Sequence, residues 1–271
     1  MRSFHIFLTM ASMSLLAGCA GPDSRPDPVA KSMVILPQAS ADAGAGKSSK
    51  QLQRLTVLAP DLDPGVIALA LEARSCAVRN GAADADARLA VIDYSRASTE
   101  KRLWVFDMAS ERLLYREYVA HGSGSGDNFA KRFSNIEGSY QTSLGLFRTA
   151  ETYMGKNGYS LRMDGLDPGF NDNARPRAIV MHGAWYANPE LIRSQGRLGR
   201  SQGCPALREQ IAKVVIDDLK QRNLVFAYAD DATWLRTGRS FACDGRSAAQ
   251  ILAMGRSASP ENGQHEGIAA I

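Results

Sequence analysis

The sequence predicts a mainly β fold with a few helices. Short segments rich in Val, Leu, Ile, Tyr, Phe and Trp lie between polar or turn-forming residues, at 89–93, 102–108 and 113–120. One strong helical pattern follows the Gly-Cys-Pro sequence at 203–205, and strands and helices do not alternate regularly along the chain. A doubly wound sheet needs that alternation, so we expect a sheet-based domain in which one helix lies beside the candidate site.

The N-terminus predicts an export signal over residues 1–19. Arg2 gives it a charged start, and the apolar run 6–16 is too short to span a bilayer as a permanent helix. The ending Leu-Ala-Gly-Cys resembles a bacterial lipobox, which implies cleavage before Cys19 and a lipid anchor on its thiol. Because Ala20 and not Asp follows, the resemblance implies an outer-membrane lipoprotein in the periplasm. A simple cleaved secretory peptide is the alternative.

Composition sets the domain boundaries. Residues 20–50 contain mostly small and polar residues and predict a flexible linker with a span of roughly 30 Å. Residues 251–271 return to Ser, Gly, Asn and Gln and predict a disordered tail. The catalytic domain is therefore expected over 51–250. The formal net charge of +4 is too small for the dense basic surface of a nucleic-acid binder, so we expect no nucleic-acid partner.

The domain is expected to open with a helix that Asp63 caps, that has Pro64 in its first turn and that runs toward Cys76. Residues 109–112 predict the turn of a hairpin between two of the strands. The remaining elements are a strand at 178–181 that ends at His182, a helix that begins at Pro205, and a strand at 224–229.

Cysteine bookkeeping predicts one disulfide, because the export signal places the chain in an oxidising compartment. Lipid occupies Cys19, which leaves Cys76, Cys204 and Cys243. If Cys204 stays free for catalysis, Cys76 and Cys243 are the only intramolecular pair.

Cys204 has the local setting of a nucleophile. It lies between Gly203 and Pro205, directly before the predicted helix, where free backbone N–H groups and the helix dipole favour a thiolate. We therefore expect a lowered thiol pKa, and an oxyanion hole made by the N–H groups of Gly203 and Cys204. The alternative is a buried structural cysteine, which is the commoner case for a free thiol.

Elimination identifies the base. Of the four histidines, one leaves with the signal and one lies in the tail, so His121 and His182 remain. His182 ends an apolar strand before Gly183, where its ring can point into a cleft and serve as a base.

His121 begins the glycine-rich segment 121–126, which predicts a mobile flap or a substrate-lining loop. Its glycines do not follow a phosphate-binding pattern. A zinc site of His121, His182 and Cys204 lacks paired ligand spacing, so we expect no metal and no cofactor.

These residues carry a resemblance to a known family. Met-His-Gly at 181–183 and Gly-Arg-Ser-Gln-Gly-Cys-Pro at 199–205 resemble the YkuD-type L,D-transpeptidase family, in its murein L,D-transpeptidase-like branch. The matching text extends over about 89–243 and also includes residues 101–106, 121–122, 143–147 and 165–171.

The resemblance implies a YkuD-like β-sandwich catalytic domain that acts on peptidoglycan stem peptides. Cys204 attacks the carbonyl between the L-centre of meso-diaminopimelate and the terminal D-alanine, and D-alanine leaves. His182 takes the thiol proton and is oriented by the carbonyl of Gly183. An amine of another stem then forms a cross-link between two diaminopimelate residues, or water resolves the acyl-enzyme as in an L,D-carboxypeptidase.

Two departures from the family pattern leave alternatives open. Gln202 replaces a histidine, and Pro-Ala at 205–206 replaces Val-Arg, so the usual arginine is missing. We expect its role to pass to Arg197, Arg200 or Arg208, since substrate carboxylates need a cation. The rival functions are a secreted cysteine amidase or protease of other specificity and a non-catalytic wall-binding lipoprotein. The substrate-contact candidates are His121, Arg197, Arg200 and Ser201, with Arg208 as a further cation.

Overall fold

The computed structural model describes residues 39–258. The predicted signal 1–19 with its lipidated Cys19, the linker up to residue 38 and the tail from residue 259 lie outside the described residues. Within 39–258, no helix combines the length and the hydrophobicity that a membrane crossing requires.

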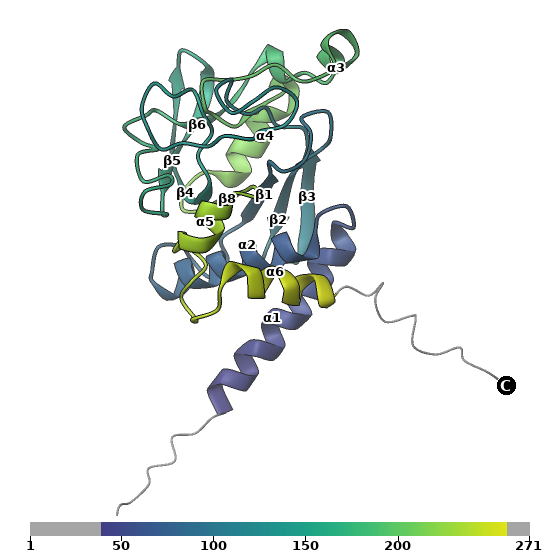
Figure 1. Cartoon of the computed structure of the whole chain (residues 1–271), viewed down its shortest axis with the longest axis vertical. Coiled ribbons are helices and arrows are strands. Elements are labelled where there is room, and N and C mark those ends of the chain that lie inside the picture. Colours follow the sequence, from purple (N-terminus) through teal and green to yellow (C-terminus); the bar gives the residue numbers. More distant parts are fainter. Residues whose placement is uncertain (1–38, 259–271) are drawn as a thin grey trace, which may run out of the picture. The chain divides into compact units, whose positions relative to one another are not determined.

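One eight-stranded sheet forms the centre of the domain, in the order β3-β2-β1-β8-β4-β5-β6-β7 (Figure 1). Most neighbours pair antiparallel, but β1 and β8 are parallel, as are β6 and β7. The predicted mainly β fold is thereby confirmed. The strands are β1 Leu89–Asp93, β2 Leu103–Asp107, β3 Arg112–Glu117, β4 Gly145–Gly155, β5 Gly158–Gly165, β6 Val180–Gly183, β7 Ala206–Leu207 and β8 Leu224–Tyr228.

Helices cover the sheet in two places. Helix α2 packs beside β1 and β8 and also against α6, and α4 packs beside β5 and β6 (Figure 1). Gly255 makes the close approach of α2 and α6 possible, because a Cβ there would lie 2.5 Å from the carbonyl oxygen of Pro64. The helices are α1 Ala39–Leu58, α2 Pro64–Arg79, the short 3₁₀ helix η1 Trp185–Ala187, α3 Glu190–Gln195, α4 Glu209–Leu219, α5 Ala232–Thr237 and α6 Ala248–Ser257.

The elements with strong local signals are confirmed. Helix α2 begins at Pro64, and the Asp63 carboxylate accepts the Gly65 N–H at 2.7 Å, as a capping residue does. Strand β1 has the predicted bounds, and β2 and β3 form the predicted hairpin. The β4–β5 hairpin was not predicted. A register shift between Thr149 and Thr152 breaks the alternation of apolar and polar residues by which a strand is recognised.

Two predicted boundaries are wrong. Residues 39–50 of the expected linker belong to α1, which continues into a part that buries Leu52 and Leu55. The expected disorder from Ile251 is wrong up to residue 257, because α6 carries a capping box at Ser247 and buries Ile251 and Leu252. In both cases tertiary burial stabilises a helix whose composition is poor in large apolar residues.

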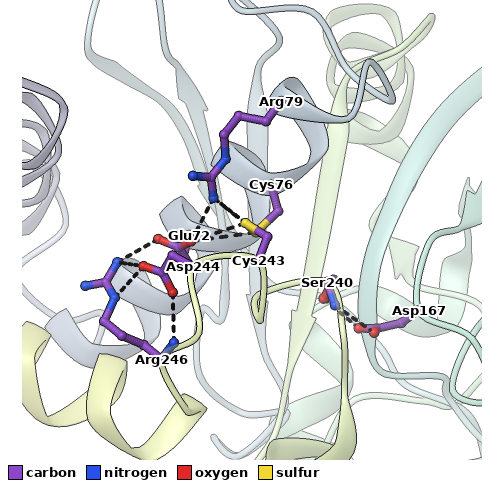
Figure 2. The surroundings of a disulfide bond; sticks show 8 residues. All are labelled: Glu72, Cys76, Arg79, Asp167, Ser240, Cys243, Asp244 and Arg246. Atoms are coloured by element: carbon purple, nitrogen blue, oxygen red, sulfur yellow. Dashed lines mark hydrogen bonds and ion pairs between the residues drawn. A yellow bond between two sulfur atoms is a disulfide. The ribbon is translucent and has the colours of Figure 1, made fainter. Parts of the chain in front are cut away.

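Cys76 and Cys243 form a disulfide with a Cα–Cα distance of 5.8 Å (Figure 2). It joins α2 to the segment between α5 and α6, across a sequence separation of 167 residues. Glu72 lies beside the sulfur atoms and receives the Arg246 guanidinium at 3.0 Å. The crosslink therefore connects the two ends of the described domain.

The same segment is held a second time, by the buried carboxylate of Asp167 (Figure 2). Asp167 accepts the backbone N–H groups of Arg239 at 2.8 Å and Ser240 at 3.0 Å, the Ser240 hydroxyl at 2.6 Å and the Trp234 indole N–H at 3.1 Å. A buried carboxylate with this many donors is well satisfied, so the segment stays attached to the β5–β6 connection.

Removal of the disulfide is expected to lower stability without removing the site. The double variant Cys76→Ser, Cys243→Ser should lose about 2 to 5 kcal/mol of unfolding free energy, because the unfolded chain regains the freedom of a long loop. Guanidinium unfolding of the oxidised wild type and the variant measures the difference. The reduced wild type is the control and should match the variant. A loss below about 0.5 kcal/mol would show that this crosslink does not constrain the unfolded chain in the way loop entropy requires.

Candidate active site

The loop that carries Cys204, here called the nucleophile loop (residues 201–205), is closed by hydrogen bonds of its own. The Ser201 hydroxyl donates to the carbonyl oxygen of Cys204 at 2.6 Å and accepts the N–H of Gly203 at 3.1 Å. Gly203 has a φ of 119°, a conformation that favours glycine. Ser201 is buried and engaged in this brace, so the structure gives it a supporting position and not the substrate contact that the sequence analysis expected.

Strand pairing brings Cys204 and His182 to adjacent segments. In the parallel β6–β7 pair, His182 is opposite Ala206, two residues after Cys204. The N–H of Val180, two residues before His182, lies 3.5 Å from the Cys204 Sγ. The two exposed fractions are 8% for Cys204 and 3% for His182, so both groups lie just below the surface.

The helix after Cys204 starts later than predicted. Residues 206–207 form β7, and α4 begins at Glu209 with Arg208 at its N-cap. Pairing with the buried strand β6 takes Ala206 and Leu207 out of the expected helix, because both become fully buried in the sheet. Cys204 is therefore not at a helix N-terminus, and the helix dipole does not act on its thiol as expected.

The thiol pKa moves in the opposite direction from the one predicted. Burial raises the pKa of Cys204 above its ordinary value, while the N–H of Val180 and the charge of Arg177 partly oppose that rise. Without a helix terminus at Cys204, desolvation is the largest influence. The resting thiol is therefore protonated at neutral pH.

His182 is held in one tautomer. Its Nδ1 lies 2.9 Å from the carbonyl oxygen of Gly183, and because a carbonyl only accepts, Nδ1 carries the proton. This is the orientation that the resemblance implies. Burial lowers the pKa of His182, so its Nε2 is an unprotonated acceptor at neutral pH. The ring of Tyr186 stands edge-on to the imidazole, with 6.4 Å between centroids.

Gly203 is not a free oxyanion donor, because its N–H is used by Ser201. That part of the predicted oxyanion hole is wrong. Among the residues that the structure describes, the N–H of Cys204 itself has no protein acceptor, so it stays available for a developing oxyanion.

His121 is a buried structural residue in this structure. Its exposed fraction is 0%, and Arg102 lies with Nη2 2.8 Å from its Nδ1. Burial, with the charge of Arg102, lowers the pKa of His121 to about 3, so the ring is neutral and accepts from Arg102. The expected substrate contact by His121 is therefore corrected.

The glycine-rich segment is not a free flap either. Ser201 donates its N–H to the carbonyl of His121 at 2.9 Å, and Ser123 donates to the carbonyl of Ser201 at 2.8 Å. A Cβ on Gly122 would lie 2.8 Å from the Cα of Gly203. The segment therefore packs against the nucleophile loop and is hydrogen-bonded to it. Gly122 allows the two backbones to come into contact.

The predicted cations have acidic partners. Arg200 bonds Asp127 at 2.9 Å, and Arg197 lies 3.9 Å from the same carboxylate. Arg208 makes two hydrogen bonds to Glu117, at 3.1 and 2.7 Å. Arg208 therefore has a carboxylate of its own, whereas Arg197 and Arg200 share the single charge of Asp127.

The sequence analysis missed Arg177. A Cβ added to Gly203 would lie 3.6 Å from its Nη2, so the guanidinium lies beside the nucleophile loop. The only local signal is its place five residues before His182, which no pattern distinguishes from an ordinary surface arginine.

Comparisons with known proteins support one family. A family model described as the L,D-transpeptidase catalytic domain matches residues 58–228. No curated protein sequence matches the chain. Solved structures also match the chain at low identity, and the chain spans less than two thirds of the length of the first two given below.

The first is the L,D-transpeptidase LdtMt1 in complex with imipenem, with 16% identity, a TM-score of 0.33 and coverage of 53% of this chain and 59% of that chain. An L,D-transpeptidase from Mycobacterium smegmatis has 15% identity, a TM-score of 0.32 and coverage of 52% and 58%. An L,D-transpeptidase from Stackebrandtia nassauensis has 13% identity, a TM-score of 0.33 and coverage of 60% and 68%.

Proposed function

This chain belongs to the L,D-transpeptidase catalytic domain family, and from that premise we propose that it performs cysteine-dependent acyl transfer on peptidoglycan stem peptides. The observation that carries the proposal is the pairing of β6 with β7, which brings the segment of the free thiol Cys204 next to the segment of His182, whose tautomer leaves Nε2 as the acceptor. Nucleophilic acyl transfer uses a thiol and an unprotonated imidazole nitrogen, and adjacent segments supply both here.

In the first step, Nε2 of His182 takes the proton of Cys204 while Sγ attacks the carbonyl carbon between diaminopimelate and the terminal D-alanine. The backbone N–H of Cys204 donates to the developing oxyanion. The carbon–nitrogen bond then breaks, the imidazolium returns its proton to the leaving amine, and D-alanine departs. A thioester to Sγ remains.

In the second step, an amine of another stem peptide attacks the thioester and gives its proton to Nε2. The thiolate leaves, takes the proton back, and a cross-link between two diaminopimelate residues is formed. Water in place of the amine yields the tripeptide instead, which is the L,D-carboxypeptidase outcome.

The raised thiol pKa gives a direct pH prediction. Because burial favours the neutral thiol, the rate of Cys204 alkylation by iodoacetamide in the substrate-free protein should rise with a midpoint above 9.0, the ordinary value. A pH series of pseudo-first-order rates, read by intact mass, measures this midpoint. A midpoint below about 8.5 would show that the thiolate is already stabilised in the resting protein, against the desolvation argument.

The function itself is tested with purified disaccharide tetrapeptides and a soluble form that begins after Cys19. A mass adduct on Cys204, D-alanine release and a dimer product support an L,D-transpeptidase. An adduct with tripeptide and no dimer supports an L,D-carboxypeptidase. Neither adduct nor D-alanine contradicts the proposal and favours the unrelated amidase or the wall-binding lipoprotein.

The location is part of the proposal. The apolar run at 6–16 and the Leu-Ala-Gly-Cys sequence support export to the periplasm and a lipid anchor on Cys19. Detergent-phase partitioning of the full-length protein and of Cys19→Ser tests the anchor. The wild type should enter the detergent phase and the variant should not; equal partitioning would contradict the anchor.

A further inference from the structure

Several ionisable groups act on or lie near the thiol of Cys204, and among the residues described by the structure one of them is a permanent cation. Tyr94 follows β1, Tyr186 lies in η1 and His182 lies in β6; all three are neutral near pH 7. Arg177 precedes β6 and carries a full positive charge that acts on the thiol. Within residues 39–258, Arg177 is therefore the charged side chain that acts on the Cys204 thiol.

The guanidinium of Arg177 is fixed without an ion pair. Nη1 donates to the Ser134 carbonyl at 2.7 Å and to the Ser143 hydroxyl, and Nη2 donates to the Gln141 carbonyl at 2.8 Å and the Ser139 hydroxyl at 3.2 Å. Among the described residues no carboxylate lies within ion-pair distance of it, and Glu137 acts only from farther away. Neutral partners hold the group in place and leave its charge uncompensated.

The backbone that follows Arg177 contacts the thiol of Cys204. The carbonyl oxygen of Ala178 lies 3.8 Å from the Cys204 Sγ, and the N–H of Val180 lies 3.5 Å from it. Ala178 has a φ of 54°, an unusual conformation for a residue with a side chain. The chain thus turns sharply between Arg177 and β6, and the guanidinium comes to lie beside Gly203.

We propose that Arg177 is a positioning residue whose uncompensated charge stabilises the Cys204 thiolate. This inference rests on the proposed role of Cys204 as the nucleophile. Four of the five N–H donors of the guanidinium already have partners. One free N–H is too few for a bidentate hydrogen bond to a substrate carboxylate. The thiolate is the attacking group in the first step and the leaving group in the second, so the same charge supports both steps.

The experiment is the pH profile of Cys204 alkylation, which needs no peptidoglycan. Arg177→Gln should raise the midpoint by about one pH unit and slow alkylation at a fixed neutral pH about tenfold. Arg177→Lys keeps the charge and should recover most of that loss. Arg175→Gln is the matched control: it removes the same charge two residues away, where the guanidinium pairs with Glu151 and Asp164, and should leave the midpoint unchanged.

A second pair of variants keeps the test valid if Arg177→Gln does not fold. Ser139→Asp places a carboxylate against the guanidinium and neutralises its charge while Arg177 keeps its place; the midpoint should rise. Ser139→Asn is the uncharged control and should behave as wild type.

An unchanged midpoint in folded Arg177→Gln, or equal midpoints for Ser139→Asp and Ser139→Asn, would overturn the proposal. If the midpoints shift as expected but tetrapeptides give neither adduct nor D-alanine, the electrostatic role of Arg177 stands and the proposed substrate is wrong.

Discussion

Cys204→Ser is expected to lower D-alanine release from tetrapeptide substrates by at least about a thousandfold in kcat/KM. A serine hydroxyl holds its proton far more tightly than a thiol, and the neutral His182 in this site is not basic enough to compensate. Product quantification by mass spectrometry with wild type and variant at equal concentration measures the loss.

The matched control uses the other cysteines of the domain. The double variant Cys76→Ser, Cys243→Ser removes two sulfur atoms that lie outside the nucleophile loop and should keep the adduct on Cys204 at temperatures where the variant is folded. Full activity of Cys204→Ser on muropeptides would mean that the nucleophile is another residue.

His182→Gln should lower kcat/KM by about 10² to 10⁴, because it removes the group that takes the thiol proton. The wild-type activity should fall at acidic pH as Nε2 becomes protonated. Since burial lowers the pKa of His182, this fall should occur below 6.5, and the variant should lack it. Rate profiles over pH with a tetrapeptide substrate measure both effects.

His121→Gln is the comparison for that experiment. The amide keeps an acceptor for Arg102, and His121 is neutral well into the acid range, so the acidic limb of the profile should stay where it is in the wild type. If His121→Gln removed the limb and His182→Gln kept it, the two histidines would have to exchange roles.

Local signals were sufficient for much of the framework. Asp63 and Pro64 predicted the start of α2, and the apolar, β-forming composition of 89–93 predicted β1, because capping and strand composition depend only on neighbouring residues. Elimination among a few cysteines and histidines selected Cys204 and His182 as the candidate pair. Caps, strand composition and the number of cysteines and histidines can all be read from the sequence without knowledge of the fold.

The properties that decide reactivity came only from tertiary structure. Burial reversed the predicted direction of the Cys204 pKa, and pairing of Ala206 with His182 moved the start of α4 away from the thiol. His121 became a buried acceptor because the fold brings Arg102, 19 residues earlier in the chain, against its ring. None of these contacts has a local signature.

The arginines also show that charge compensation cannot be read from the sequence. Arg208 is neutralised by Glu117, 91 residues away in sequence, whereas Arg177 is held by backbone carbonyls and serine hydroxyls and stays uncompensated. The sequence alone does not show which of these two arginines has an acidic partner. By itself the sequence determined which residues are chemically able to act. The fold decided which of them are desolvated, paired or free, because solvation and charge compensation depend on neighbours that are distant along the chain.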